Sequence, residues 1–175
     1  LFVDTMVIVT SDHGEWFGEA GFMGHGAGLQ PGLVHVPLLV KYPGQREAAT
    51  VDDAVSGTDV FPTVMAAAAL EATSRVDGRD LQEAAPPEGR VAIAESFEIE
   101  SLAAAHPRFT GDERAAFTGP FVYRLLRDAR REAETWCDGV NPPPAQPAPP
   151  QRPDLFARLY DLEKAATELP LVPVR

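Results

Sequence analysis

The sequence contains a single cysteine, Cys137, among its 175 residues. One thiol excludes an internal disulfide and a zinc site built from several cysteines. Basic residues are also few, since 15 Lys and Arg face 26 Asp and Glu and leave a formal net charge of -11. This balance provides no broad basic surface for a phosphate backbone, so we expect no nucleic-acid partner.

Long apolar runs are missing as well, because no stretch reaches the roughly 18 consecutive apolar residues that a membrane span needs. We therefore expect no membrane segment in this chain. The sequence begins with Leu1 instead of methionine and enters a strand-like run almost at once. We expect from this that an N-terminal half of the same protein is missing. The compartment is left open, because a targeting segment would lie in that half.

The hydrophobic content of 45% is enough for a buried core, and it is concentrated in short runs typical of strands. Residues 5–10 form a continuous β-branched run, which predicts a strand buried on both faces of a parallel sheet. Residues 34–40 predict a second strand that leads into a Pro43-Gly44 turn, and residues 51–55 predict a third.

A helix is expected directly after these strands. Thr58 or Asp59 can cap it, Pro62 falls in its first turn, and residues 64–70 are strong helix formers. Residues 91–94 then resume the pattern of a buried strand. Strands and a helix that alternate in this order indicate the α/β fold class.

The last third of the chain has a different pattern. Residues 115–126 consist of two mostly apolar halves around a Thr-Gly-Pro turn and predict a β-hairpin, whereas residues 127–136 have helical propensity with weak periodicity. Seven of the 17 prolines fall within residues 141–153, which predicts an extended surface loop of polyproline type. Residues 155–162 return to an apolar, strand-like pattern.

Asp12 and His13 stand at the end of the first predicted strand, where ligands collect in open α/β sheets. A carboxylate beside an imidazole is half of a metal site, and the pair suits Mn²⁺ or Zn²⁺ while tolerating Ca²⁺ or Mg²⁺ among further carboxylates. The alternative interpretation is a turn in which Asp12 accepts from backbone amides and His13 is exposed. Glu15 could orient His13, as metal-bound histidines require, or be a solvated carboxylate.

His25 lies between two glycines on a loop with seven glycines in residues 14–32. Such a backbone can aim the imidazole at an anionic ester or a leaving group, although a lone loop histidine is also typical of an ordinary surface. His35 is expected to be structural and His106 exposed. Cys137 has no nearby histidine, and the sequence lacks a phosphate-binding loop, a nucleophile elbow and a dinucleotide fingerprint.

Five motifs occur in an order that resembles the sulfatase family of the alkaline phosphatase superfamily. They are Ser11-Asp12-His13-Gly14-Glu15, Gly24-His25-Gly26, the sequence HVPLLVKYPG at residues 35–44, the D-x-x-P-T helix within residues 56–64, and LYDLE at residues 159–163. The resemblance implies the C-terminal part of an alkaline phosphatase-like α/β sandwich with a small C-terminal antiparallel β subdomain. Residues 1–110 would belong to the catalytic α/β domain. Residues 111–175 would form the subdomain, with the proline-rich insertion at residues 141–153.

The resemblance also implies hydrolysis of a small-molecule or glycan sulfate ester. The family's metal ligands correspond to Asp12 and His13, and the residue that contacts the sulfate oxygens and aids departure of the leaving group corresponds to His25. One divalent ion is implied, Ca²⁺ for a formylglycine sulfatase and Mn²⁺ or Zn²⁺ for a phosphoryl-transfer relative. The family's C/S-x-P-x-R nucleophile motif is absent, and Cys137 does not match it. We therefore expect a nucleophile upstream of Leu1, and weak metal binding without ester hydrolysis by this chain alone.

Two alternatives remain. One is a phosphodiesterase, phosphonate monoester hydrolase or phosphoglycerol-type transferase on the same fold, because these enzymes share the Asp-His pair. The other is a non-catalytic interaction module that binds a partner through its proline-rich run, residues 142–153. The organic group of the substrate is not encoded in the residues at hand.

Overall fold

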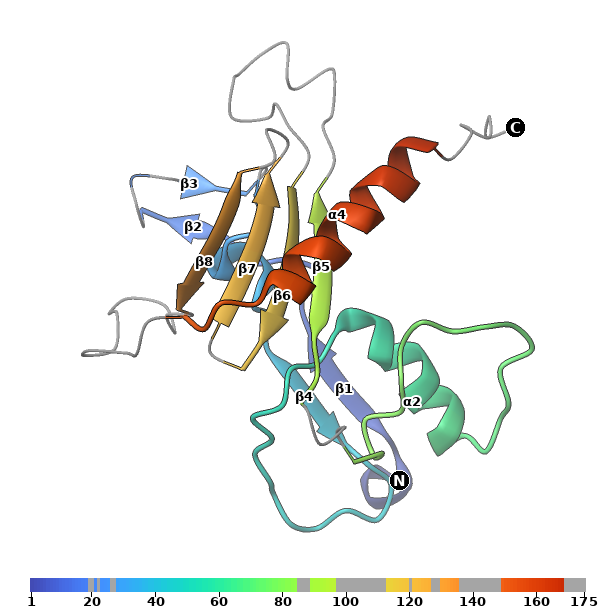
Figure 1. The fold of residues 1–175 in the computed structure, drawn as a ribbon. Helices are drawn as coiled ribbons and strands as arrows, with labels where there is room; N and C mark the ends of the chain where they lie inside the picture. The colour runs from blue at the N-terminus through green and yellow to red at the C-terminus, as the bar shows by residue number, and fades with distance from the viewer. Residues whose placement is uncertain are drawn as a thin grey trace, which may run out of the picture. The chain divides into compact units, whose positions relative to one another are not determined.

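The structure, a computed structural model, forms two compact units (Figure 1). The first consists of Leu1–His25 with Gly32–Ala92, and the second of Gly26–Pro31 with Ile93–Arg175. None of the helices among the described residues has the length and apolarity of a membrane span. The residues described are 1–18, 21, 23–25, 28–84, 89–96, 113–119, 121–126, 130–135 and 149–168, without the side chains of 134, 135 and 162–168.

The first unit contains a two-stranded antiparallel sheet. After a single 3-10 turn, η1 (Phe2–Asp4), strand β1 (Val7–Thr10) pairs with β4 (Leu38–Lys41). Val9 and Leu39 face each other in this register and are 55% and 60% exposed. The prediction of a strand buried on both faces of a parallel sheet is therefore wrong. A β-branched run favours an extended backbone, but residues elsewhere in the chain decide whether the strand pairs parallel or antiparallel and whether its faces are buried. Among the described residues, β4 is the only strand that pairs with β1.

The segment predicted as the second strand is divided between a helix and a strand. Val34 ends a one-turn helix, α1 (Pro31–Val34), and the strand begins only at Leu38. Pro37 directly before it has no amide hydrogen to give to a ladder. The predicted Pro-Gly turn is confirmed, because Gly44 has a φ of 75° and the amide of Gln45 donates to the Tyr42 carbonyl at 3.2 Å.

Residues 51–55 form no strand, so that prediction is wrong. The helix that follows is confirmed in place, and Asp59 is its N-cap residue as predicted, although the Asp59 side chain makes no capping bond to α2 itself. Ser56 caps the 3-10 turn η3 (Gly57–Asp59), with the Asp59 side chain returning to the Ser56 amide in a capping box, and α2 (Val60–Ala67) continues from it. The helix ends before Leu70, because Ala69 takes a left-handed φ of 53°.

The Asp59 side chain is fully buried and ties distant segments to the start of α2. It accepts from the Ser56 amide at 2.8 Å, from the Arg79 amide at 3.0 Å and from both terminal nitrogens of the Arg90 guanidinium. Burial raises the pKa of the Asp59 carboxyl, but Arg90 and the two amides lower that pKa more. Asp59 is therefore a buried carboxylate stabilised in its charged form.

Thr63, one turn after Asp59, adds two further hydrogen bonds, one within the start of α2 and one to the segment after residue 78. Its hydroxyl donates to the Asp59 carbonyl at 2.7 Å and accepts from the Leu81 amide at 3.0 Å. Gly78 comes so close that a Cβ there would lie 2.0 Å from the Thr58 carbonyl oxygen. The D-x-x-P-T motif thus has a structural role in this chain, because its Asp and Thr fasten the segment around residues 78–81.

The second unit contains a four-stranded sheet in the order β5-β6-β7-β8, with α4 packed against β6 and β7 (Figure 1). Its core includes Val122 and Tyr123 from the sheet and Leu155 and Leu159 from the helix, each at most 4% exposed. The predicted hairpin is confirmed by the antiparallel register of β6 and β7, and the strand at residues 91–94 by β5. The elements are β5 (Ala92–Ser96), β6 (Glu113–Thr118), β7 (Phe121–Leu126), β8 (Arg131–Thr135) and α4 (Pro153–Glu168).

Two predictions for the last third are wrong. Residues 155–162 belong to α4 and not to a strand, since Leu155 and Leu159 recur at helical spacing and are both buried. The region with helical propensity provides β8, where Glu132 lies opposite Arg124 and pairs with it at 2.7 Å. That cross-strand partner outweighs a weak local propensity. Most of the proline-rich run, residues 141–148, lies outside the described residues.

Candidate active site

The chain leaves β1 in a tight polar turn built by its own side chains. The Ser11 hydroxyl donates to the His13 carbonyl at 2.7 Å, and the His13 amide donates to Asp12 Oδ1 at 3.0 Å. The backbone amide of His13 is the main cause that lowers the pKa of the Asp12 carboxyl, so this group is ionised at neutral pH. Asp12 therefore does accept from a backbone amide, as the turn interpretation predicts, but only through one of its two oxygens.

The second oxygen of Asp12 lies toward the His13 ring. Oδ2 is 3.8 Å from His13 Nε2, while His13 Nδ1 is 2.8 Å from the Gly14 carbonyl oxygen. A carbonyl only accepts hydrogen bonds, so Nδ1 carries the proton and Nε2 of the neutral ring keeps its lone pair. The two side chains, 86% and 47% exposed, thus offer one oxygen and one nitrogen donor near each other at the surface.

This donor pair fits a divalent ion in its chemistry and its orientation. A carboxylate oxygen and an imidazole nitrogen suit Mn²⁺ or Zn²⁺, and the oxygen also suits Ca²⁺. The bond from Nδ1 to a backbone carbonyl is the arrangement that fixes the ring of metal-binding histidines. Within the described ranges, no group of three or more His, Cys, Asp or Glu side chains is arranged to hold a metal. Asp12 and His13 therefore offer two potential donors, without a third among the residues that the structure describes.

Gly14 holds this turn close to α1. Its amide donates to the Leu33 carbonyl at 2.7 Å, and a Cβ on Gly14 would lie 2.1 Å from the Gly32 carbonyl oxygen. Gly32 in turn faces Trp16, with 3.2 Å between its own would-be Cβ and the indole ring. The backbone directly after the Asp-His pair is therefore packed too tightly to accept a side chain at residue 14.

A short antiparallel ribbon brings His25 beside His13. Strand β2 (Trp16–Phe17) pairs with β3 (Met23–Gly24), with Trp16 opposite Gly24, so residues at the open end of the ribbon become neighbours. There Glu15 Oε1 is 3.1 Å from His25 Nδ1, and the ring centroids of His13 and His25 are 4.4 Å apart. Asp12, His13 and His25 thus belong to one exposed cluster within the first unit.

Glu15 has a different partner from the one predicted. The hypothesis that it orients His13 is wrong, because the Gly14 carbonyl fills that position and Glu15 contacts His25 instead. The sequence contained no signal for this pairing beyond the turn residues between the two strands of the ribbon. His35 is exposed, whereas His106 and Cys137 lie outside the described residues.

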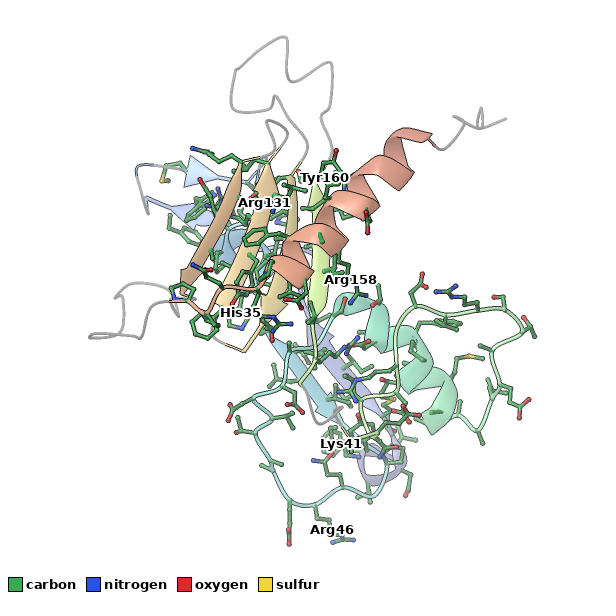
Figure 2. All side chains as sticks on the ribbon, in the orientation of Figure 1. His35, Lys41, Arg46, Arg131, Arg158 and Tyr160 are labelled. Carbon is green, nitrogen blue, oxygen red and sulfur yellow. The ribbon has the colours of Figure 1, made fainter. Side chains whose placement is uncertain are left out.

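Lys41, in the motif at the end of β4, does not contribute to the cluster. Its ammonium donates to the backbone carbonyls of Phe2, Val3 and Thr5 at 2.6, 2.7 and 2.9 Å (Figure 2). Three acceptors use the three hydrogens of an ammonium group. The cation is therefore engaged in holding the first residues of the chain and is not available to an anionic ligand.

Residues 2–70 match the family model described as Sulfatase. The chain is 35% identical over 97 residues to "Uncharacterized sulfatase YidJ" of Escherichia coli, a match that covers 55% of this chain and 19% of that protein. It is 38% identical over 91 residues to "Low-salt glycan biosynthesis sulfotransferase Agl7" of Haloferax volcanii, covering 50% and 22%. Its 29% identity to "Arylsulfatase K" of Danio rerio extends over 165 residues, 94% of this chain and 27% of that protein.

The chain therefore spans between about a fifth and about a quarter of the length of these relatives, 19%, 22% and 27% respectively. The matched residues 2–70 include the whole cluster of Asp12, His13, Glu15 and His25. No solved structure matches the chain.

Proposed function

We propose that the chain belongs to the sulfatase family of the alkaline phosphatase superfamily, and that it provides the metal-binding and leaving-group part of a site that hydrolyses sulfate esters. One observation supports this above the others. An oxygen and a nitrogen donor 3.8 Å apart stand directly beside a second imidazole, whose ring centroid is 4.4 Å away. Cleavage of a sulfate ester needs both kinds of group, one for the ester oxygens and one for the departing oxygen.

In this proposal Asp12 and His13 hold one divalent ion. The ion, when bound, supplies Lewis-acid stabilisation of the negative charge on the ester oxygens. His13 binds it through Nε2, because Nδ1 is engaged by the Gly14 carbonyl. Asp12 brings a charged oxygen, since its pKa is held below the ordinary value of 3.8. The ion is Ca²⁺ in a formylglycine sulfatase and Mn²⁺ or Zn²⁺ in a phosphoryl-transfer relative.

His25 acts on the ester itself. Glu15 holds its Nδ1 at 3.1 Å, which directs the opposite ring nitrogen, Nε2, away from Glu15. The ring is 58% exposed, so an ester can reach it. Cleavage builds negative charge on the bridging oxygen. With both ring nitrogens protonated, His25 donates from Nδ1 to Glu15 and from Nε2 to the bridging oxygen, which stabilises that charge.

The nucleophile is proposed to come from outside residues 1–175. No C/S-x-P-x-R sequence occurs in them, and Cys137 is followed by Asp138 and Gly139. These residues therefore contain neither the nucleophile motif nor more than two of the proposed metal ligands. For both reasons we propose that the 175 residues alone hydrolyse no ester at a useful rate. The substrates we propose are small-molecule or glycan sulfate esters.

The test is hydrolysis of 4-nitrophenyl sulfate and 4-nitrophenyl phosphate by the complete enzyme that contains this chain. We expect turnover of the sulfate, loss of it on treatment with a chelator, and recovery on return of the metal. Asp12→Asn and His13→Ala should abolish that recovery. Asp53→Asn, which changes an exposed carboxylate outside the cluster, should not.

Two results would contradict the proposal in different ways. A preference for the phosphate ester would replace it with the phosphodiesterase or phosphonate hydrolase alternative on the same fold. Sulfate turnover that is unchanged by the chelator and by the Asp12 and His13 substitutions would contradict the proposed role of these two residues in binding a metal.

A further inference from the structure

Two large apolar side chains are exposed on the ribbon of β2 and β3 (Figure 1). Phe17 on β2 and Met23 on β3 are direct partners in the antiparallel register, and they are 76% and 66% exposed. Side chains that face each other across two such strands have Cβ atoms about 5 Å apart. Phe17 and Met23 therefore form one apolar patch on the first unit, which we call the apolar pair.

The apolar pair lies on the same face of the ribbon as the Glu15 side chain. Successive side chains along extended backbone alternate between two faces, so Phe17 shares a face with Glu15 and not with Trp16. The Trp16 ring packs instead against Gly32, 3.2 Å from where a Cβ would lie. Glu15 contacts His25 at 3.1 Å. Two residues of strand rise about 7 Å, so the apolar pair begins about that far from this contact.

The charge of the surrounding sequence favours an uncharged ligand group beside the apolar pair. Residues 1–40 contain no Lys or Arg, and the ammonium of Lys41 donates to three backbone carbonyls. An organic group with further carboxylates or sulfates would therefore gain no ion pair with Lys or Arg from this segment. A phenyl ring and a thioether instead make their most favourable contacts with other aromatic rings.

We propose that Phe17 and Met23 determine the specificity of the site by packing against the organic group of the sulfate ester, and that this group is an uncharged aromatic ring system. The inference rests on the proposed function, because His25 locates the ester, and it names the substrate class of that same site. With the bridging oxygen at His25, the organic group extends along the ribbon over the apolar pair. A glycan with further anionic groups is the alternative that the experiment decides.

The first test compares two esters that differ in one charged group. The complete enzyme that contains this chain is assayed with 2-naphthyl sulfate and with its 6-sulfonate derivative, which have the same ring system. We expect kcat/KM to be about tenfold higher for the uncharged ring. Met23→Lys should bring the two values together or reverse their order, because it places a cation beside the sulfonate.

The second test separates binding from chemistry. Phe17→Ala and Met23→Ala should each raise KM for 2-naphthyl sulfate about tenfold with kcat nearly unchanged, because the apolar pair touches the organic group and not the reacting atoms. Phe17→Leu and Met23→Leu keep most of the apolar area and should keep KM near the wild-type value. Val51→Ala shortens another apolar side chain of the first unit, 70% exposed, and is the matched control that should leave KM unchanged.

An unchanged KM in both alanine variants would overturn the proposal, as would a wild-type preference for the sulfonated ester, which would favour an anionic glycan. Faster hydrolysis of 2-naphthyl phosphate than of the sulfate, with the same dependence on Phe17 and Met23, would count against the proposed function alone. If the enzyme hydrolyses neither ester, equilibrium binding of 2-naphthyl sulfate to the wild type and to the two alanine variants decides the role of the apolar pair in the same way.

Discussion

The rings of His13 and His25 are in contact in a tilted arrangement, with 4.4 Å between their centroids and 34° between their planes. Twelve positions separate them in the sequence, and the two-residue strands of the β2 and β3 ribbon return the chain between them. Each ring is held at Nδ1 by a different acceptor, the Gly14 carbonyl for His13 and the Glu15 carboxylate for His25. In the proposed function the His13 ring binds the metal, and the His25 ring, whose acceptor is a charged carboxylate, contacts the ester.

Replacement of His25 should slow the enzyme most for poor leaving groups. We expect His25→Ala to lower kcat about 100-fold on an aryl sulfate with a basic leaving group, because the charge on the bridging oxygen is then largest. His25→Lys should retain part of the rate, since an ammonium also stabilises that charge. A series of aryl sulfates with leaving groups of increasing pKa measures this. An equal loss across the series would contradict the role of His25 at the bridging oxygen.

Glu15→Gln should lower kcat about tenfold while leaving metal affinity unchanged, because Glu15 contacts His25 and not His13. Glu47→Gln, another exposed carboxamide substitution in the first unit, is the control and should behave as wild type. Metal affinity by calorimetry separates the two histidines. A loss of affinity in Glu15→Gln would mean that Glu15 supports the metal site after all.

Gly14→Ala should destabilise the first unit by about 3 kcal/mol, because the new Cβ would lie 2.1 Å from the Gly32 carbonyl oxygen and the backbone must shift. Gly57→Ala is the matched control, since a Cβ there meets nothing within 4 Å. Urea unfolding of the two variants gives the comparison. Similar midpoints would show that the turn accommodates a side chain.

Asp59 should make stability depend on pH on the acid side. Its folded pKa lies below the ordinary 3.8, so the unfolded chain binds more protons in the interval between the two values. The stabilisation is therefore fully present above pH 3.8 and is lost as the pH falls through the folded pKa. Asp59→Asn should flatten this dependence and, by leaving Arg90 without a charged partner, cost about 3 kcal/mol at neutral pH. Acid unfolding curves that coincide for both proteins would contradict it.

Local signals in the sequence predicted local structure well. The Pro43-Gly44 turn, the hairpin around Gly119 and the helix after Asp59 depend on residues within a few positions of each other, and the structure has all of them. The position of Asp12 and His13 at the end of a strand is confirmed for the same reason.

Predictions that depend on distant partners were the ones that were wrong. The direction of β1 is set by β4, and the strand at β8 by the pairing of Arg124 with Glu132. The apolar run at residues 155–162 is compatible with either a strand or a helix, and burial of Leu155 and Leu159 on one face decides for the helix. Glu15 meets His25 because β2 and β3 pair. Each of these strands has only two residues, which is too short to produce a recognisable alternation of apolar and polar residues in the sequence.

The contacts of Lys41 have a further consequence for β1. Lys41 lies opposite Val7 in the ladder, and its ammonium is bound to carbonyls of residues that precede that strand, while the Gly44 amide donates to Val3 at 2.8 Å. Slippage of β1 by one residue would turn each of its side chains to the opposite face and would break all of these bonds together. Lys41 therefore stabilises the register of β1 against β4. This register fixes where β1 ends, and with it the position of Asp12 and His13, which directly follow the strand.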